Sequence, residues 1–351
     1  MEEVPMVKKS CFVFMAVWIG LALIASAALK AHAQTINLTY SDSFPSAHSQ
    51  SMLNRAWCKE VEARTKGRVK IQYFPGGSLT KPTECYDAVV KGASDICHSA
   101  FSYNPGRFPL MDTAGLPLGY TSGKVATAVV NELYRHYKPA ELSETVVMYV
   151  HAHGPGFFHT KGKAVRRLED MSGLRIQCQG VSELITKQLG SVPVFGTMNE
   201  TYDMLRKGTV VGANYPFESD ASLRLGEQCN YVTAAYSVSY CLPMYVVMNK
   251  NKWNALPNDI KNTIMEINNE WVPQHGEAWD AFDRLGMLFF LSHGGRIIGL
   301  DMQEAARWKI AVYPIIDNYV KFLYRKKLNG LEIIDFTMNA LNSMIRQESK
   351  P

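Results

Sequence analysis

Apolar and polar positions alternate along several short segments of this chain, and amphipathic helical segments separate them. Period-two alternation is typical of half-buried strands, whereas apolar residues three or four positions apart are typical of helices. The pattern opens with a strand at 35–40, a loop at 41–48 and a helix through Leu53, Trp57 and Val61. The other predicted strands are 68–74, 94–100 and 146–153, and the other predicted helices are 84–91, 123–137, 302–323 and 331–345. Strands that alternate with helices in this way predict an α/β fold.

Residues 168–219 show the alternation most clearly. Strand, helix, strand, helix and strand follow one another there, with Gly or Pro at nearly every junction. In an open α/β sheet, ligands bind beyond the carboxyl ends of the strands. We therefore expect the segments after Ile176 and after Val211 to face a binding cleft.

A helix of unusual length is predicted from about Asn258 toward Met287 and beyond. Pro273 lies inside this segment, and the amphipathic spacing resumes directly after it. Because proline lacks an N–H and crowds the preceding turn, we expect a kink at Pro273 rather than the end of the helix.

The central region also carries a series of motifs whose order is informative. The motif positions are Asp170, Gly173, Leu174, Arg175, Ile176, Gln177, Leu189, Gly190, Glu200, Tyr202, Val210, Val211, Gly212 and Pro216. This series resembles the pattern D-x-x-G-[LM]-K-[IL]-R, L-G, E-x-Y and V-D-G-x-x-x-P of the DctP-type solute-binding proteins of tripartite ATP-independent periplasmic (TRAP) transporters. Two earlier segments, GRVKIQYFPGGSLT and NPGRFPLMDTAGLPLGY, resemble the first domain of the same family.

The resemblance implies a two-lobed fold like that of periplasmic binding proteins. Each lobe would hold a mixed β-sheet flanked by helices, and the long kinked helix would span both lobes. The break at 154–156, Gly-Pro-Gly, is a natural crossing point between the lobes. The expected division is 34–152 plus 241–286 for lobe I, and 153–240 plus 287–351 for lobe II.

Two residues depart from the family pattern. The family arginine that clamps a ligand carboxylate corresponds to Gln177, and the Asp of V-D-G corresponds to Val211. A glutamine amide offers one neutral donor edge and cannot replace the charged bidentate fork of arginine. Arg175 lies two residues earlier on the same side of the predicted strand, so it could supply the missing charge. Other donors that could meet a ligand carboxylate are His153, the backbone N–H groups near Val181, and Tyr or Asn side chains.

The predicted cleft is mostly aromatic and uncharged. Aromatic rings give a small organic molecule apolar contact, while hydroxyl and amide groups fix its polar atoms. Phe44 and Phe217 could instead belong to the core, and Met198 stands where the family often has an aromatic residue that stacks on ligand. The expected ligand-binding residues are Phe44, His48, Tyr103, His153, Arg175, Gln177, Asn214, Tyr215, Phe217 and Tyr240.

Motifs for catalysis and cofactor binding are absent from the sequence. It contains no G-x-S-x-G, H-E-x-x-H, P-loop or dinucleotide-binding glycine pattern. His151 and His153 would share one face of a strand, with His159 nearby, but no further ligand at metal-site spacing is evident. We expect no cofactor and no metal, with His153 donating to a ligand and His151 buried in the sheet.

The N-terminus has the three parts of a secretory signal peptide. Lys8 and Lys9 precede an apolar run that ends at Ala31-His32-Ala33, so we expect cleavage after Ala33 and export to the periplasm. An uncleaved membrane anchor is the alternative, because the apolar run is nearly long enough to span a bilayer.

The net charge and the cysteine content add two smaller expectations, one about partners and one about disulfides. Removal of residues 1–33 takes three Lys and two Glu from 37 basic and 32 acidic residues, leaving 34 and 30, so the formal charge is +4. So small a charge, without basic clusters, argues against nucleic acid as a partner. Six cysteines remain, of which Cys58 and Cys85 are the first pair to test for a disulfide, and buried free thiols are the alternative.

The resemblance to the TRAP solute-binding proteins, together with the predicted signal peptide, implies a monomeric extracytoplasmic receptor. It would bind a small organic acid, such as a 2-oxo or aromatic acid, or a less charged analogue, in the cleft between the lobes. It would then deliver this ligand to the small and large membrane subunits of a TRAP transporter. The alternatives are an exported binding protein that serves a sensor and an exported enzyme on the same fold.

Overall fold

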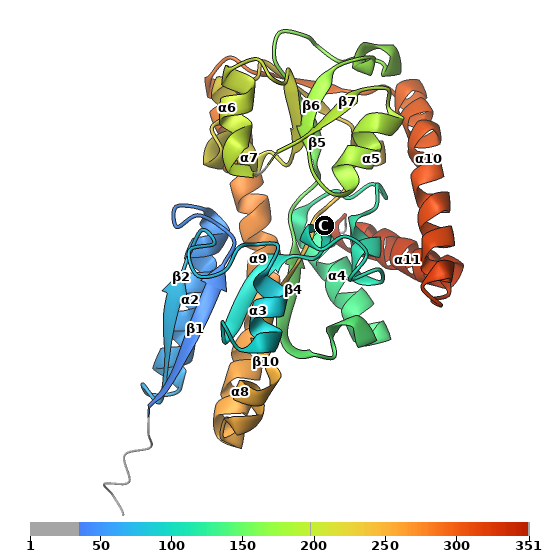
Figure 1. The fold of residues 1–351 in the computed structure, drawn as a ribbon. Helices are drawn as coiled ribbons and strands as arrows, with labels where there is room; N and C mark the ends of the chain where they lie inside the picture. The colour runs from blue at the N-terminus through green and yellow to red at the C-terminus, as the bar shows by residue number, and fades with distance from the viewer. Residues whose placement is uncertain (1–34, 197, 350–351) are drawn as a thin grey trace, which may run out of the picture.

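Two β-sheets organise the chain into two lobes, one above the other in Figure 1. The computed structural model describes residues 35–196 and 198–349. The predicted signal peptide, residues 1–33, lies outside the described residues. The two-lobed α/β fold expected from the sequence is confirmed.

The sheet of lobe I has five strands in the order β2-β1-β3-β10-β4. The first three strands are parallel, whereas β10 is antiparallel to β3 and β4. The chain therefore returns from lobe II to complete the sheet of lobe I. The strands are β1 (Ile36–Asp42), β2 (Val69–Phe74), β3 (Ile96–Ala100), β4 (Thr145–Ala152) and β10 (Pro243–Asn249).

The sheet of lobe II has six strands in the order β11-β9-β5-β8-β6-β7. Here β6 is parallel to β7 and β8, and β5 is antiparallel to both of its neighbours. The carboxyl ends of β6 and β8 therefore lie at the same edge of the sheet. The strands are β5 (Phe157–Thr160), β6 (Arg175–Cys178), β7 (Val192–Phe195), β8 (Gly212–Tyr215), β9 (Tyr231–Ala234) and β11 (Arg296–Gly299).

Helices cover both faces of the sheet in lobe I. Along β10, Tyr245 and Val247 belong to one apolar cluster and Val246 and Met248 to another, as the two-residue period of a strand requires. Helix α2 packs on the second cluster, and α3 and α4 pack on the first. The helices are α2 (Ser49–Arg64), α3 (Cys85–Lys91), α4 (Gly123–Tyr137), α5 (Val181–Gln188), α6 (Thr201–Arg206), α7 (Glu218–Ser222), α8 (Lys250–Ala255), α9 (Asn258–Ser292), α10 (Met302–Arg325) and α11 (Gly330–Glu348).

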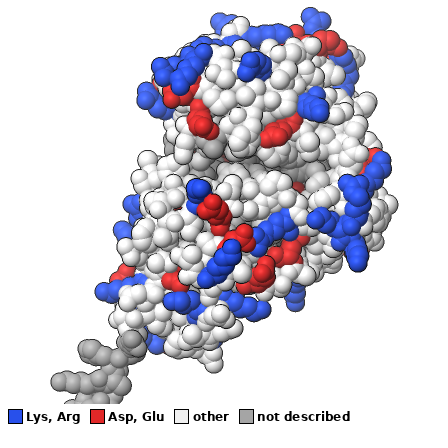
Figure 2. Space-filling model, viewed as in Figure 1, with Lys and Arg blue, Asp and Glu red and all other residues white. Residues whose placement is uncertain are grey.

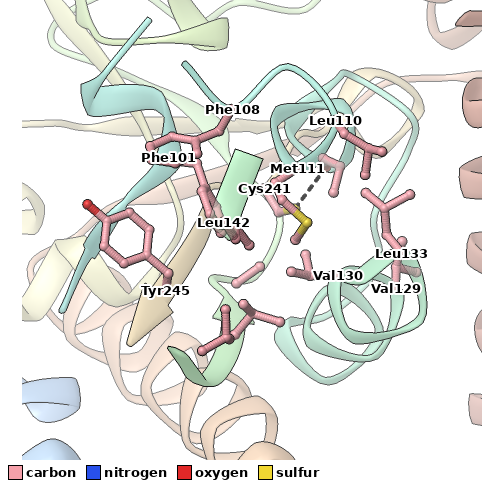
Figure 3. Packing of buried hydrophobic residues seen from close by; sticks show 14 of the residues in the cluster. Phe101, Phe108, Leu110, Met111, Val129, Val130, Leu133, Leu142, Cys241 and Tyr245 are labelled. Atoms are coloured by element: carbon pink, nitrogen blue, oxygen red, sulfur yellow. Dashed lines mark hydrogen bonds between the residues drawn. The ribbon is translucent and has the colours of Figure 1, made fainter. Parts of the chain in front are cut away.

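The first cluster is the larger of the two and fills the space between the sheet and α4. Figure 3 shows Phe101, Phe108 and Tyr245 on one side of it, and Val130 and Leu133 of α4 on the other. Burial of each such side chain contributes about 1.5–3 kcal/mol relative to leaving it exposed. The cluster therefore fixes α4 and the loop 101–116 against the sheet.

Helix α9 is 35 residues long and continues through Pro273, so the long helix predicted from the sequence is confirmed. One turn of it contacts the starts of helices in both lobes. Asp280 Oδ1 accepts a hydrogen bond from Gly123 N of α4 at 2.6 Å, and Asp283 Oδ1 accepts one from Glu218 N of α7 at 2.8 Å. Both aspartates satisfy N–H groups that a helix start leaves unpaired. Helix α9 thus joins the lobes through specific contacts as well as through its length.

The C-terminal helix does not follow the division expected from the sequence. Ile333 and Leu341 of α11 lie in the same apolar cluster as Val130 of α4, and Tyr137 Oη donates to Glu332 Oε1 at 3.0 Å. Helix α11 therefore packs on lobe I, although residues 287–351 were assigned to lobe II. Helix α10 makes this possible because it runs along lobe II and returns the chain toward α4 (Figure 1).

The pair named first for a disulfide test, Cys58 and Cys85, does not form a disulfide, and Cys58 is a buried free thiol, which was the alternative. The disulfide joins Cys85 to Cys97, whose Cα atoms are 6.0 Å apart. Cys58 belongs to the α2 cluster and Cys85 to the α4 cluster, so the two lie on opposite faces of the sheet. The cysteines Cys58, Cys178, Cys229 and Cys241 are buried and free.

No helix in residues 35–196 or 198–349 combines the length and the apolar content that crossing a membrane requires.

Candidate ligand-binding site between the lobes

A cavity of about 1230 Å³ opens between the lobes, and a smaller one of about 30 Å³ lies at its inner end. The two share the lining residues Tyr103, Gln179, Met198 and Leu242, so they form one cleft with an outer and an inner cavity. Figure 2 shows the hollow between the lobes, with walls that are mostly uncharged. Both lobes and α10 line the outer cavity, through residues that include Lys81, Pro243, Gly180, Leu184, Phe195 and Ile315.

The inner cavity brings together most of the side chains predicted for the cleft. The predicted residues that line it are Phe44, His48, Tyr103, His153, Tyr215 and Tyr240. Sequence reasoning did not select Trp279, Glu218 and Gln179, which also line it. Trp279 comes from the middle of α9, far beyond Pro216, the last of the motif positions, so no local signal marked it.

Four predicted residues do not line either cavity. Arg175 begins β6 and is exposed, at the opposite end of the strand from the cleft, so it cannot replace the family arginine in this conformation. Phe217 packs 5.3 Å from Phe157 in the core of lobe II. Gln177 and Asn214 are buried in the sheet of lobe II, next to the cleft.

Phe44 and His48 form part of the wall contributed by lobe I. Their rings stack with centroids 4.0 Å apart, and both meet Trp279 edge-on at about 6 Å. Phe44 N donates to Asp42 Oδ1 at 3.0 Å, which fixes the loop where it leaves β1. Edge-to-face contacts of this kind are favourable beyond the area that they bury. The wall is therefore a rigid aromatic surface.

A buried chain of hydrogen bonds holds Trp279 from behind. Trp279 Nε1 donates to His151 Nδ1 at 3.1 Å, and the Nε2 atoms of His151 and His98 are 3.2 Å apart. His98 Nδ1 lies 2.8 Å from Asp42 Oδ1. Because a neutral imidazole has one donor and one acceptor, the indole donor makes His151 Nε2 the next donor and His98 Nδ1–H the donor to Asp42. The order of donors is thus fixed from Trp279 to the carboxylate.

The ionisation states agree with this order. Burial would raise the pKa of Asp42, but its contacts with His98, Tyr73 and Phe44 N lower it. Burial holds the pKa of His151 well below its usual value, and neighbouring histidines lower it further. Asp42 is therefore ionised and His151 neutral at physiological pH.

His48 and Glu218 form a buried contact across the cleft. His48 Nε2 lies 3.2 Å from Glu218 Oε1 on α7, and both side chains are at most 5% exposed. His48 Nδ1 accepts a hydrogen bond from Gln50 N at the start of α2, so Nε2 is the donor to Glu218. Burial would raise the pKa of Glu218, but the interaction with His48 lowers it. This contact joins lobe I directly to lobe II.

His153 and Tyr240 lie on the two segments that cross between the lobes. Gly156 N donates to Tyr240 O at 2.9 Å, which holds the segments side by side. A Cβ atom on Gly156 would lie 2.1 Å from the Tyr240 ring, so only glycine permits this approach. His153 Nδ1 donates to Gly154 O, and the rings of His153 and Tyr240 are 5.5 Å apart. Burial lowers the pKa of His153 to about 4.

The wall of lobe II contains amides with unused hydrogen-bonding capacity. Gln177 Nε2 donates to Gly196 O at 2.7 Å. Within the described part of the chain, Gln177 Oε1 and both amide atoms of Asn214 have no hydrogen-bond partner. Tyr215 Oη lies 3.2 Å from Thr201 Oγ1 and faces the inner cavity.

No Lys or Arg within residues 35–196 and 198–349 lines the inner cavity, whose ionisable residues are His48, His153, Glu218 and three tyrosines. Lys81 and Lys187 lie farther out, on the outer cavity. Burial raises the pKa values of Tyr103, Tyr215 and Tyr240, so the three tyrosines remain neutral donors. The inner cavity therefore offers aromatic rings, neutral polar groups and one carboxylate, Glu218, which is bonded to His48.

The buried His98 does not form a Ser-His-Asp triad with its neighbours Ser43 and Asp42. Ser43 Oγ and Asp42 Oδ1 approach the same atom, His98 Nδ1, at 3.2 and 2.8 Å. A serine and an acid must contact opposite nitrogens of a histidine before the ring can pass a proton between them. His159, the third histidine considered for a metal, instead bonds to Asp220 in lobe II at 3.0 Å. In the part of the chain that the structure describes, no group of three His, Cys, Asp or Glu side chains could hold a metal ion.

Known proteins show the same architecture. A TRAP periplasmic solute-binding protein from Desulfovibrio salexigens superposes with a TM-score of 0.82 at 29% identity, over 90% of this chain and 98% of that one. A marine metagenome TRAP solute-binding protein specific for aromatic acids, solved with 3-hydroxybenzoate, gives 0.83 at 25% identity, over 89% and 99%.

Sequence comparison agrees with the structures. A solute-binding protein of Albidiferax ferrireducens is 26% identical over 298 residues, which are 83% of this chain and 88% of the relative. Residues 40–322 match the family described as bacterial extracellular solute-binding protein, family 7, or DctP. The chain belongs to this family, the DctP-type solute-binding proteins of TRAP transporters.

Proposed function

We propose that this protein is the extracytoplasmic receptor of a TRAP transporter and captures a small organic acid with an aromatic or otherwise apolar body. One observation carries the proposal. The inner cavity is lined from both lobes by aromatic rings, which include Phe44, Trp279 and Tyr215, and by no Lys or Arg of the described residues. The marine relative that binds aromatic acids supports the same class of ligand.

The aromatic walls favour a flat apolar body. Phe44 and Trp279 are in edge-to-face contact at 66°, with centroids 6.1 Å apart, so together they form one apolar surface against which a ligand can pack. Tyr103 and Tyr215 supply hydroxyl groups that reach polar atoms of the ligand. A ligand enclosed in this way is shielded from water by both lobes, so its binding stabilises the closed arrangement.

The acid group requires donors other than the family arginine. Gln177 replaces that arginine and is turned onto Gly196 O, and Arg175 is exposed. An unpaired buried carboxylate is too costly to persist, so neutral hydroxyl, amide or imidazole groups must meet the charge. This requirement favours monocarboxylates over dicarboxylates.

The remaining parts of the proposal concern location and partners. The signal peptide expected at residues 1–33 would place the protein in the periplasm as a monomer, where it would deliver its ligand to small and large membrane subunits. Transport is favoured over a sensor role because the relatives of known structure are TRAP proteins. The arrangement at His98 gives no support to an enzyme.

A thermal-shift screen tests the proposal. The whole chain is expressed in a bacterial host, purified from the periplasm and heated with benzoate, 3-hydroxybenzoate, mandelate, 2-oxobutyrate, succinate or glucose. At a ligand concentration 100 times Kd, binding adds about 2.7 kcal/mol of stability, which raises the Tm measurably. We expect one or more monocarboxylates to raise the Tm and glucose to have no effect. A shift with glucose alone would contradict the proposal.

A further inference from the structure

The hydrogen bond that His153 makes fixes which of its two ring nitrogens carries the hydrogen. His153 lies at the end of β4, where the chain leaves lobe I, and its side chain lines the inner cavity. Its Nδ1 atom contacts the carbonyl oxygen of Gly154. A carbonyl oxygen can only accept, so Nδ1 carries the hydrogen.

The second nitrogen follows from the first. A neutral imidazole has a single N–H, and in His153 that hydrogen is on Nδ1. Nε2 therefore presents a lone pair, and it has no hydrogen bond to any residue in 35–196 or 198–349. In this state His153 accepts hydrogen bonds and repels a carboxylate, contrary to the donor role that the sequence suggested. It becomes a donor at Nε2 only when it binds a proton.

We propose that an organic acid places its carboxylate in the inner cavity and its body in the adjoining outer cavity, and that it binds together with one proton, which Nε2 of His153 takes from solvent. The resulting imidazolium keeps its bond to Gly154 O and gains an N–H that points to the ligand carboxylate. A charge-assisted hydrogen bond then replaces the ion pair that the family arginine would form. No covalent bond of the ligand changes, and the proton returns to solvent when the acid leaves. This inference rests on the proposed function.

Burial shifts the pKa values of most groups around His153 toward their neutral forms. Burial raises the pKa values of Tyr103, Tyr215 and Tyr240, so these hydroxyls stay protonated. The pKa of His151, deeper in β4, is held well below its usual value, so this ring stays neutral. Burial raises the pKa of Asp283, which packs against Gly154 from α9, well above its usual value.

The two remaining neighbours are engaged with each other. His48 Nδ1 accepts from Gln50 N and its Nε2 contacts Glu218, so both nitrogens of this ring already have partners. Glu218 is held ionised because His48 lowers its pKa against the effect of burial. Its negative charge faces the same cavity and favours a proton on His153. Burial sets the pKa of free His153 at about 4, so the ring is neutral before the acid enters.

Calorimetry of the wild-type protein tests proton uptake directly. Benzoate, 3-hydroxybenzoate, mandelate and 2-oxobutyrate are titrated at pH 5.5 in two buffers of different ionisation enthalpy. The difference between the two observed enthalpies gives the number of protons bound, and we expect close to one. Over pH 5–8, Kd should rise with pH by up to about tenfold per unit, because the complex holds a proton that the free protein lacks.

Two variants assign the proton. His153→Gln keeps a neutral polar side chain, and we expect it to bind the acid at least tenfold more weakly at pH 5.5 with no proton uptake. His293→Gln, which changes an exposed histidine at the end of α9, should keep the wild-type uptake. If His153→Gln still takes up a proton, the assignment to His153 is wrong, since the ligand or another residue then carries it.

The outcomes separate this inference from the proposed function. Binding of an acid with no proton uptake by the wild-type protein would overturn the inference and leave the receptor proposal intact. Failure of all four acids to bind would overturn the organic-acid proposal, and the inference with it.

Discussion

The two walls of the cleft use strand-end polar residues in different ways. In lobe I, Asp42 and His151 are joined through His98 into a chain of hydrogen bonds that ends on Trp279. In lobe II, Gln177 uses only its amide hydrogens, and the Asn214 amide has no partner among the described residues. Lobe I therefore presents a surface whose shape is fixed before ligand arrives. Lobe II keeps unused hydrogen-bonding capacity next to the cleft.

This difference indicates that the two lobes contribute differently to stability and to ligand binding. A surface held by buried charge-assisted bonds moves little when ligand binds, so it defines the shape of the ligand that is accepted. Unpaired buried amides cost free energy, which ligand binding or a shift of lobe II can recover. We therefore expect changes in lobe I to alter stability most, and changes in lobe II to alter binding more than stability.

Removal of the Asp42 carboxylate, which ends the chain of hydrogen bonds in lobe I, should have the largest effect on stability. Asp42 accepts from His98, Phe44 N, Asn54 and Tyr73, and it is fully buried. We expect Asp42→Ala to lower the free energy of unfolding by about 3–5 kcal/mol, because the partners lose a buried charged acceptor. Urea denaturation at pH 7 measures the change. Asp317→Ala, at an exposed ion pair, is the control and should cost less than about 0.5 kcal/mol.

Loss of the disulfide should rank next. Cys85 and Cys97 are separated by 12 positions, and a crosslink that closes a loop of this size contributes about 3 kcal/mol through the unfolded state. The double variant Cys85→Ser, Cys97→Ser should lose about this amount in urea denaturation. Reductant should destabilise the wild-type protein equally and leave the double variant unchanged. An equal response of both proteins to reductant would contradict the pairing.

The buried histidines of lobe I should make stability depend on pH. Burial lowers the pKa of His275 to about 3, whereas the unfolded chain returns it to about 6.5. A histidine with a lowered folded pKa contributes its full stability above the unfolded pKa and loses it as pH falls. Between pH 7 and pH 5 the loss for one such group is about 2 kcal/mol.

The variant His275→Gln isolates this contribution. Urea denaturation at several pH values should show that the wild type loses about 2 kcal/mol more than His275→Gln between pH 7 and pH 5. The exposed residue His293, changed to Gln, should leave the wild-type profile unaltered. Parallel profiles for wild type and His275→Gln would mean that His275 is charged in the folded protein.

The smallest effect on stability is expected in lobe II. Gln177→Ala removes one buried hydrogen bond, to Gly196 O, and should cost about 1 kcal/mol. The same change should weaken binding of the acid several-fold, because Gly196 precedes the segment that carries Met198 to the cleft. Urea denaturation and calorimetry measure the two effects. Gln303→Ala, on the exposed surface of α10, should change neither.

The sequence predicted the fold in detail where patterns are local. The helix expected at 123–137 matches α4, because amphipathic spacing and the Ser122 cap act within a few residues. The disulfide and the position of α11 were predicted wrongly, because each depends on which face of a sheet or which lobe a helix covers. That choice is made by packing between distant segments, and the sequence pattern of one helix does not encode it.

The same distinction applies to the cleft. Phe44 and Tyr103 lie just after strands and Tyr215 is the last residue of β8, so the rule that ligands bind beyond strand ends predicted their place on the inner cavity. Trp279 could not be predicted in this way, because it lies in a helix. A tryptophan on the apolar face of a helix can equally be part of the hydrophobic core. Arg175 was considered as a replacement for the family arginine because side chains alternate along a strand, so Arg175 lies on the same side as Gln177. It lies two residues farther from the cleft, however, and is exposed.

A crystal structure of the protein grown with the acid that raises its Tm most would test the central claim most directly. We predict that the carboxylate lies in the inner cavity, within hydrogen-bond distance of His153 Nε2, and that the apolar body extends past Tyr103 and Met198 into the outer cavity. Tyr103 or Tyr215 should contact the acid from the other side of the cavity. Density for the acid only in the outer cavity near Lys81 and Lys187, with the inner cavity unchanged, would contradict the account.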